Sequence, residues 1–156
     1  MKVLIAYDSV SPMKLTAKVA EAIAAVLKEK GVEVDSFFVK DVDVAKAKDY
    51  GCVIVGGPAM YFKMSSGAAQ FLDRLPEGGF LEKLGAAFDT QLQSRISGNA
   101  AKGIDNRLKK LGFMMIAAPL TVYVEGKTNA PHLKEGELEK AKNWAQEVAK
   151  ALSSKT

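Results

Sequence analysis

Short apolar segments alternate with longer segments of helical periodicity, and this alternation constrains the fold more than any other feature of the chain. The apolar segments cover residues 2–7, 33–39, 52–55, 84–88 and 113–117. Apolar residues recur every three or four positions over residues 14–30, 68–75, 100–111 and 135–152. Strands that alternate with helices in this way pair in parallel and carry helices on both faces. The sequence therefore predicts an α/β fold of three layers, with a doubly wound, five-stranded parallel sheet.

Glycine, proline and polar residues mark the expected ends of these segments. Gly31 and Gly112 follow two of the helices, and Ser65 or Ser66 is suited to cap the helix over 68–75. Consecutive glycines followed by a proline, at residues 56–58, are expected to take the third strand off the sheet at once. Residues 89–99 and 129–131 are expected to be loops, and residues 121–124 a short extension of the fifth strand.

Composition favours a single globular domain over residues 1–156. Apolar residues make up 48% of the chain and charged residues 26%, and the longest apolar runs, such as 113–120, are too short to span a bilayer. The first residues do not resemble a secretory leader, so we expect a cytoplasmic protein that does not contact the membrane.

The charged and metal-binding side chains exclude several functions. One cysteine, Cys52, lies in an apolar strand and is expected to be buried, and with a single histidine, His132, a protein-built metal site is not expected. The 22 basic and 18 acidic residues give a net charge of +4, spread along the chain. Nucleic-acid binding requires a concentrated basic stripe with aromatic residues, which is not seen. An anionic ligand or an acidic protein partner makes better use of this charge.

Ligands of doubly wound folds bind beyond the carboxyl ends of the strands, so the loops after strands one, three and four matter most. Ser9 and Ser11 precede the first helix, where hydroxyls and free backbone N–H groups suit a phosphate, although serines there also serve as helix caps. The second loop carries Met60, Tyr61 and Phe62, which suit a flat ring but also suit packing on the sheet end or a dimer contact. The third loop, residues 90–94, offers amides and hydroxyls to a polar heterocycle edge.

This arrangement resembles the flavodoxin family over nearly the whole chain. The resemblance rests on the strand, hydroxyl loop and helix at the start, the Gly56-Gly57-Pro58 loop, the Phe71-Leu72-Asp73-Arg74-Leu75 helix, and Leu133-Lys134-Glu135-Gly136-Glu137-Leu138 before the last helix. No long insertion splits the fifth strand, as in the short-chain type. The resemblance implies strand order 2-1-3-4-5 and flavin mononucleotide (FMN) at the ends of strands 1, 3 and 4.

The family comparison also implies which residues contact FMN. The cofactor-binding residues expected from it are Ser9, Val10, Ser11, Pro12, Met13, Lys14, Pro58, Ala59, Met60, Tyr61, Phe62, Thr90, Gln91 and Leu92. Among these, Ser9, Ser11 and Lys14 hold the phosphate, residues 60–62 cover the ring, and Thr90 and Gln91 meet its polar edge.

The phosphate loop departs from the family pattern Ser/Thr-x-Thr-Gly-x-Thr. Read from Ser9, the pattern places Pro12 at the glycine and Lys14 at the last threonine. Proline lacks an N–H group and fixes φ, so this reading predicts a weaker hold on the phosphate, to which the Lys14 ammonium adds a charge.

The resemblance implies an electron carrier that uses FMN, has no catalytic residue, and exchanges electrons with a reductase or acceptor protein. Because the net charge is positive, we expect that partner to be acidic or the docking to depend less on charge than is usual in the family. Two alternatives stay open. One is an FMN-dependent reductase of quinones or other small molecules, and the other is a flavodoxin-shaped binding module that has lost FMN.

Overall fold

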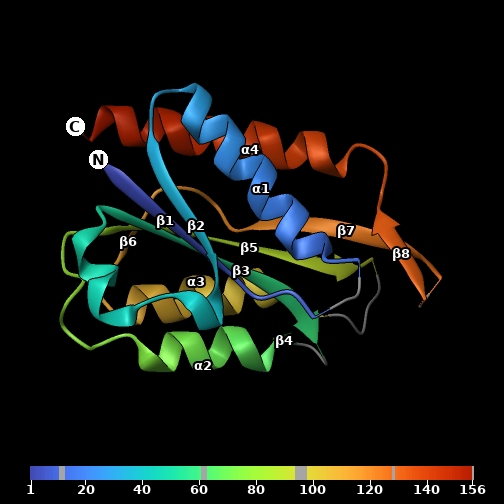
Figure 1. Ribbon diagram of the computed structural model, residues 1–156, viewed down its shortest axis with the longest axis horizontal. Helices are drawn as coiled ribbons and strands as arrows, with labels where there is room; N and C mark the ends of the chain where they lie inside the picture. The colour runs from blue at the N-terminus through green and yellow to red at the C-terminus, as the bar shows by residue number, and fades with distance from the viewer. Residues whose placement is uncertain (11–12, 61–62, 94–97, 128, 156) are drawn as a thin grey trace.

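The computed structural model describes residues 1–10, 13–60, 63–93, 98–127 and 129–155. At its centre lies a sheet with the strand order β2-β1-β3-β5-β7-β8 (Figure 1). The strands on this path are β1 (Lys2–Tyr7), β2 (Glu33–Phe38), β3 (Cys52–Met60), β5 (Leu84–Leu92), β7 (Leu120–Lys127) and β8 (Ala130–Leu133). Two short strands, β4 (Lys63–Met64) and β6 (Met114–Met115), pair with β3 and β5. The strands from β2 to β7 pair in parallel, which confirms the predicted sheet and its order.

Helices cover both faces of the sheet, as the sequence predicts. Helices α1 (Leu15–Glu29) and α4 (Glu137–Ser154) lie together on one face, and α2 (Ser66–Arg74) and α3 (Ala100–Lys110) lie on the other (Figure 1). Two 3₁₀ turns, η1 (Val39–Asp41) and η2 (Val44–Asp49), connect β2 to β3. Within the described part of the chain, no helix combines the length and the apolar character needed to cross a bilayer.

The continuous apolar character of the central strands follows from burial on both faces. On β1, Val3 and Ile5 pack beneath α1 and α4, while Leu4 and Ala6 pack against the α2 and α3 side. Cys52 begins β3 within the core, and burial raises the pKa of its thiol to about 12. The predicted burial of this cysteine is therefore confirmed.

The predicted end of the third strand at Val55 is wrong, because β3 continues through the two glycines and the proline to Met60. A Cβ atom on Gly56 would lie 2.1 Å from Cζ of Phe88, so this glycine makes room for the ring on the neighbouring strand. Pro58 is tolerated because the pairing of β1 with β3 ends at Gly56. The Pro58 carbonyl accepts the N–H of Ser65 at 3.1 Å, on the side of β3 that β1 has left.

The fourth predicted strand also extends farther than expected. β5 reaches Leu92, so Asp89, Thr90 and Gln91 belong to the sheet and not to a polar loop. Asp89 is fully buried there. The sequence pattern recognises strands by their apolar runs, so it missed this extension, which contains polar residues.

The fifth strand is interrupted, and the main part of it lies later than predicted. Only Met114 and Met115 of the expected segment pair with β5, and residues 116–119 leave the sheet before β7 begins at Leu120. The indole N–H of Trp144 on α4 donates to the carbonyl of Ala118 at 2.7 Å, which fixes the interruption. The expected loop at 129–131 is part of β8, which pairs antiparallel with β7 and forms a hairpin beyond the edge of the sheet.

Candidate functional site

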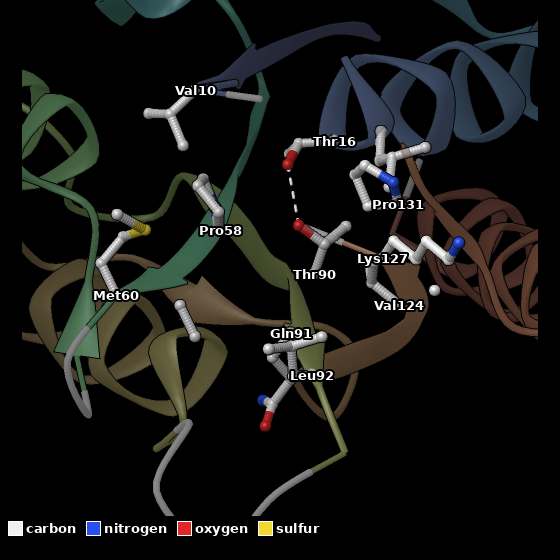
Figure 2. Close-up of a pocket in the computed structure, with 13 residues that line it drawn as sticks. Val10, Thr16, Pro58, Met60, Thr90, Gln91, Leu92, Val124, Lys127 and Pro131 are labelled. Atoms are coloured by element: carbon white, nitrogen blue, oxygen red, sulfur yellow. Dashed lines mark hydrogen bonds between the residues drawn. The ribbon is translucent and has the colours of Figure 1, made fainter. Parts of the chain in front are cut away.

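A cavity of about 350 Å³ lies at the carboxyl ends of β3 and β5, between the start of α1 and the β7–β8 hairpin (Figure 2). It is termed the mouth cavity below. Most of its lining is apolar, and it brings together residues of five elements and one loop: Val10, Leu15, Thr16, Pro58, Ala59, Met60, Thr90, Gln91, Leu92, Val124, Gly126, Lys127 and Pro131. Seven of these belong to the set predicted from the sequence.

The start of α1, whose Leu15 and Thr16 line this cavity, carries free hydrogen-bond donors next to it. The residue at its N-cap is Lys14, and among the described residues no side chain makes a capping hydrogen bond to the helix. The Ser9 hydroxyl is buried and has no hydrogen-bond partner among the described residues. Ser9 therefore does not serve as the cap that the sequence left open as an alternative, and Ser11 and Pro12 lie outside the described residues. A free hydroxyl near the uncapped N–H groups of a helix forms a donor set suited to an anion.

The hydroxyl that the sequence analysis missed is that of Thr16, in the first turn of α1. It is buried and shares a hydrogen bond of 2.8 Å with the Thr90 hydroxyl of β5 (Figure 2). Lys14 has the left-handed backbone conformation, with φ 51° and ψ 45°, which glycine adopts most readily. These observations favour reading the family pattern from Ser11, with Lys14 at the glycine and Thr16 at the last threonine. The reading from Ser9, with Pro12 at the glycine, stays a prediction, because Pro12 lies outside the described residues.

The other helices have a carboxylate at their N-termini. The Ser65 hydroxyl, which accepts the N–H of Ala68 at the start of α2, donates to Oδ2 of Asp8 at 2.6 Å. The predicted capping role of Ser65 is confirmed.

Helices α3 and α4 also have a carboxylate near their N-termini. Oδ2 of Asp89 accepts the N–H of Ala101 in the first turn of α3 at 2.8 Å. Glu137 lies in the first turn of α4, where Oε1 accepts the N–H of Tyr123 at 2.7 Å. Among the described carboxylates, none lies in the first turn of α1 or hydrogen-bonds to it. The positive end of the α1 dipole is therefore the one left for an external anion.

Asp89 lies beside the cavity on the α3 side of β5. Burial raises the pKa of its carboxyl group above the usual range, against the lowering effect of hydrogen bonds from the Ala101 N–H and from Nε2 of Gln91 at 3.0 Å. Both donors meet Oδ2, and Oδ1 has no partner among the described residues. A proton on Oδ1 would therefore leave both hydrogen bonds in place.

The predicted ring-binding residues divide into those that line the cavity and those that cannot be placed. Pro58, Ala59 and Met60 line it from β3, and Thr90, Gln91 and Leu92 line it from β5. Tyr61 and Phe62 lie outside the described residues. Met13 and Lys14 are exposed next to the cavity and do not line it.

The β7–β8 hairpin forms a wall that the sequence analysis did not predict. Val124, Gly126, Lys127 and Pro131 face the mouth cavity from this hairpin. The apolar alternation of Leu120, Val122 and Val124 was the available signal, but it was taken for a short strand extension. Lys127 contributes an ammonium group to the cavity lining.

A second cavity of about 540 Å³ adjoins the first on the α2 and α3 side, and Val10 and Met60 line both. Lys63 and Arg107 contribute positive charge to it. The described residues contain no group of three or more His, Cys, Asp or Glu side chains suited to a metal ion.

A doubly wound parallel sheet with its cavity at the carboxyl ends of the strands defines the class of open α/β proteins, whose ligands bind at this edge of the sheet. No family model and no curated protein matches the chain. Solved structures do match. The rubredoxin:oxygen oxidoreductase of Desulfovibrio gigas is 30% identical with a TM-score of 0.80, over 99% of this chain. Our chain spans 36% of the length of that protein.

Complete flavodoxins also match over nearly their whole length. A flavodoxin from the domain Archaea is 25% identical, with a TM-score of 0.79, over 98% of this chain and 99% of its own. Flavodoxin 1 of Bacillus cereus is 18% identical, with a TM-score of 0.80, over 96% of this chain and 98% of its own. The chain is a flavodoxin-like protein.

Proposed function

We propose that this chain is a single flavodoxin-like domain, residues 1–156, which binds FMN in the mouth cavity and carries electrons in the cytoplasm. The observation that supports it most directly is the distribution of carboxylates over the helix N-termini. Three of the four helices have a carboxylate of the protein at their start, whereas α1 has none among the described residues. A phosphate is therefore directed to α1 and away from α2 and α3.

At the phosphate end, the proposed ligands are the Ser9 hydroxyl, the free N–H groups of the first turn of α1 and the Lys14 ammonium group. The Ser9 hydroxyl has no other described partner, and no side chain in the described part of the chain accepts the first N–H groups of α1. Burying a donor without a partner is costly, so a phosphate oxygen would satisfy groups that the protein leaves open.

At the ring end, the cavity suits an aromatic ligand. Met60 and Leu92 offer apolar surface from two neighbouring strands, and Thr90 and Gln91 offer polar groups beside them. Tyr61 and Phe62 remain predicted ring contacts. FMN, when bound, supplies the redox chemistry, and the protein positions it and limits its contact with water.

Titration with FMN and with riboflavin tests this proposal, because riboflavin has the ring but lacks the phosphate. We expect the protein to quench FMN fluorescence at about micromolar concentrations and to bind riboflavin much more weakly. Ser9→Ala is expected to weaken FMN binding about tenfold, the usual worth of a hydrogen bond to a charged group, and to leave riboflavin binding unchanged. Absence of quenching would favour a module that has lost FMN.

The second cavity supports one alternative, an FMN-dependent reductase of quinones or other small molecules. It adjoins the mouth cavity at Val10 and Met60 and is large enough for a second substrate. Steady turnover of a quinone by the FMN-loaded protein with a reduced nicotinamide would favour this alternative. Reduction only through a separate reductase favours the carrier, whose partner we propose to be a redox protein and not a nucleic acid or a membrane.

A further inference from the structure

The rim of the mouth cavity is unusually rich in exposed apolar side chains. Four of the nine large apolar residues that are exposed within the described part of the chain lie here: Val10 at 55%, Met13 at 42%, Met60 at 39% and Leu92 at 56%. Val10, Met60 and Leu92 line the cavity, and Met13 precedes the N-cap of α1. Exposed apolar side chains gathered at one place mark an interaction site.

Three exposed lysines from separate elements accompany these apolar residues. Lys14 is the N-cap of α1, Lys63 begins β4, and Lys127 ends β7. Each belongs to the rim by position: Lys127 lines the mouth cavity, Lys63 lines the adjoining one, and Lys14 immediately precedes Leu15 of the cavity lining. No described carboxylate forms an ion pair with any of the three.

The carboxylates near this edge do not offset the lysines. Asp8 and Asp89 are buried and face the starts of α2 and α3. Asp73 pairs with Arg107, and Glu125 on the hairpin, 3.3 Å from the His132 imidazole, is a single exposed carboxylate beside three ammonium groups. The rim therefore presents an apolar centre surrounded by positive charge. We term it the rim surface, consisting of Val10, Met13, Lys14, Met60, Lys63, Leu92 and Lys127.

We propose that the rim surface docks a small acidic redox protein. The apolar centre supplies contact area around the site, and the lysines steer and orient a partner with a negative patch. This inference rests on the proposed electron-transfer function for the nature of the partner. It specifies the residues that recognise the partner and the sign of the charge that the partner must present.

The haem domain of cytochrome b5, which is acidic, and cytochrome c, which is basic, are suitable probes because both are small haem proteins and their charges are opposite. Binding is measured by NMR titration of the FMN-loaded protein at low and high salt. We expect cytochrome b5 to bind more tightly than cytochrome c, and its binding to weaken as salt rises. The shifted resonances are expected to lie on the rim surface.

Charge-reversal variants test whether cytochrome b5 binding depends on the rim surface or only on the net charge of the protein. Lys63→Glu is expected to weaken cytochrome b5 binding about five- to tenfold, whereas Lys150→Glu, the same change at an exposed position near the end of α4, is expected to alter it less than about twofold. Equal effects of the two variants, or equal binding of the two cytochromes, would overturn the proposal. FMN quenching by each variant is measured in parallel. If the protein binds FMN but not cytochrome b5, the proposal for the rim surface alone is refuted. If it binds cytochrome b5 but not FMN, the proposed cofactor alone is refuted.

Discussion

The hydroxyl groups of Thr16 and Thr90 lie 2.8 Å apart and share a hydrogen bond, although 74 residues separate them in the sequence. The bond joins the first turn of α1 to the end of β5, beside the proposed phosphate and ring positions. Both residues are buried, with exposed fractions of 2% and 3%. Each hydroxyl therefore depends on the other for its hydrogen bond, since water does not reach either freely.

Replacing either threonine by valine is expected to destabilise the protein by about 1–2 kcal/mol, because the remaining hydroxyl loses its partner. The double variant Thr16→Val with Thr90→Val is expected to lose less than the sum of the two, since no unpaired hydroxyl remains. Urea unfolding of the four proteins measures the coupling. Additive effects would show that the two hydroxyls do not stabilise one another.

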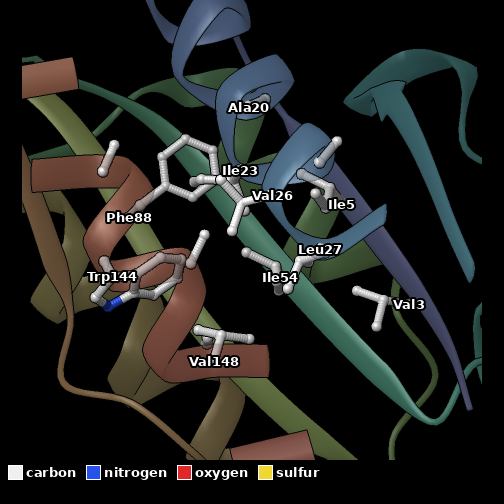
Figure 3. Packing of buried hydrophobic residues seen from close by; sticks show 14 of the residues in the cluster. Val3, Ile5, Ala20, Ile23, Val26, Leu27, Ile54, Phe88, Trp144 and Val148 are labelled. Atoms are coloured by element: carbon white, nitrogen blue, oxygen red, sulfur yellow. The ribbon is translucent and has the colours of Figure 1, made fainter. Parts of the chain in front are cut away.

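Gly56 is expected to be intolerant of any side chain. The ring of Phe88, which lies in the core between the sheet and the helices α1 and α4 (Figure 3), occupies the space that a Cβ atom would need. We expect Gly56→Ala to destabilise the protein by about 2–3 kcal/mol, as overpacking does, in a urea unfolding experiment. Adding Phe88→Leu should recover part of this loss.

Gly57→Ala is the matched control for this experiment. Its Cβ atom would meet Ala68 Cβ and Ser65 Oγ, each at 3.3 Å, and these contacts need only small shifts. We therefore expect a smaller loss of stability than for Gly56→Ala. A loss of the same size at both positions would show that the destabilisation comes from strand propensity and not from the Phe88 ring.

The layers could be predicted from the sequence because the period of the apolar residues shows directly which faces of the helices and strands are buried. The strand order followed from the family resemblance. The prediction failed at the carboxyl ends of the strands, where polar and small residues continue the sheet. Asp89 and Pro58 were expected in loops for this reason, yet Asp89 is held by the first turn of α3 and Pro58 lies where β1 has ended. A local sequence pattern shows neither the contact of Asp89 with α3 nor the end of β1 beside Pro58.

The candidate site was predicted in part. Residues on the strands, such as Met60 and Gln91, line the cavity because parallel strands end together. Thr16 was missed because the family pattern was read from Ser9, and the backbone conformation of Lys14 was needed to favour the other reading. Lys127 was missed because only the pairing of β7 with β8 shows that this hairpin reaches the cavity.

The buried carboxyl group of Asp89 is expected to lower stability at neutral pH. Its pKa in the folded protein is raised by burial above the ordinary value of 3.8. The folded state therefore binds the proton more tightly than the unfolded state does. The contribution of Asp89 to stability is then greatest below pH 3.8 and falls as the pH rises from there through the raised pKa.

Asp89→Asn is expected to remove this loss. The asparagine Oδ1 atom can replace Oδ2 of Asp89 as acceptor for Ala101 and Gln91, so the variant should be more stable at pH 7, by on the order of 1 kcal/mol. The gain should disappear near pH 4 in urea unfolding. Asp41→Asn, at an exposed aspartate, controls for the change of net charge. A variant less stable than wild type at pH 7 would mean that α3 needs the negative charge of Asp89.

Lys14 and Glu82 are the two non-glycine residues with positive φ in the described part of the chain, at 51° and 70°. A left-handed backbone costs a residue with a side chain about 1 kcal/mol relative to glycine. If Lys14 is retained there to bind phosphate, Lys14→Gly should stabilise the protein and weaken FMN binding, while riboflavin binding stays unchanged. Glu82→Gly should give a similar gain of stability with no effect on FMN. Thermal unfolding and flavin titration of the two variants measure both effects, and equal FMN affinity in the two variants would remove Lys14 from the phosphate site.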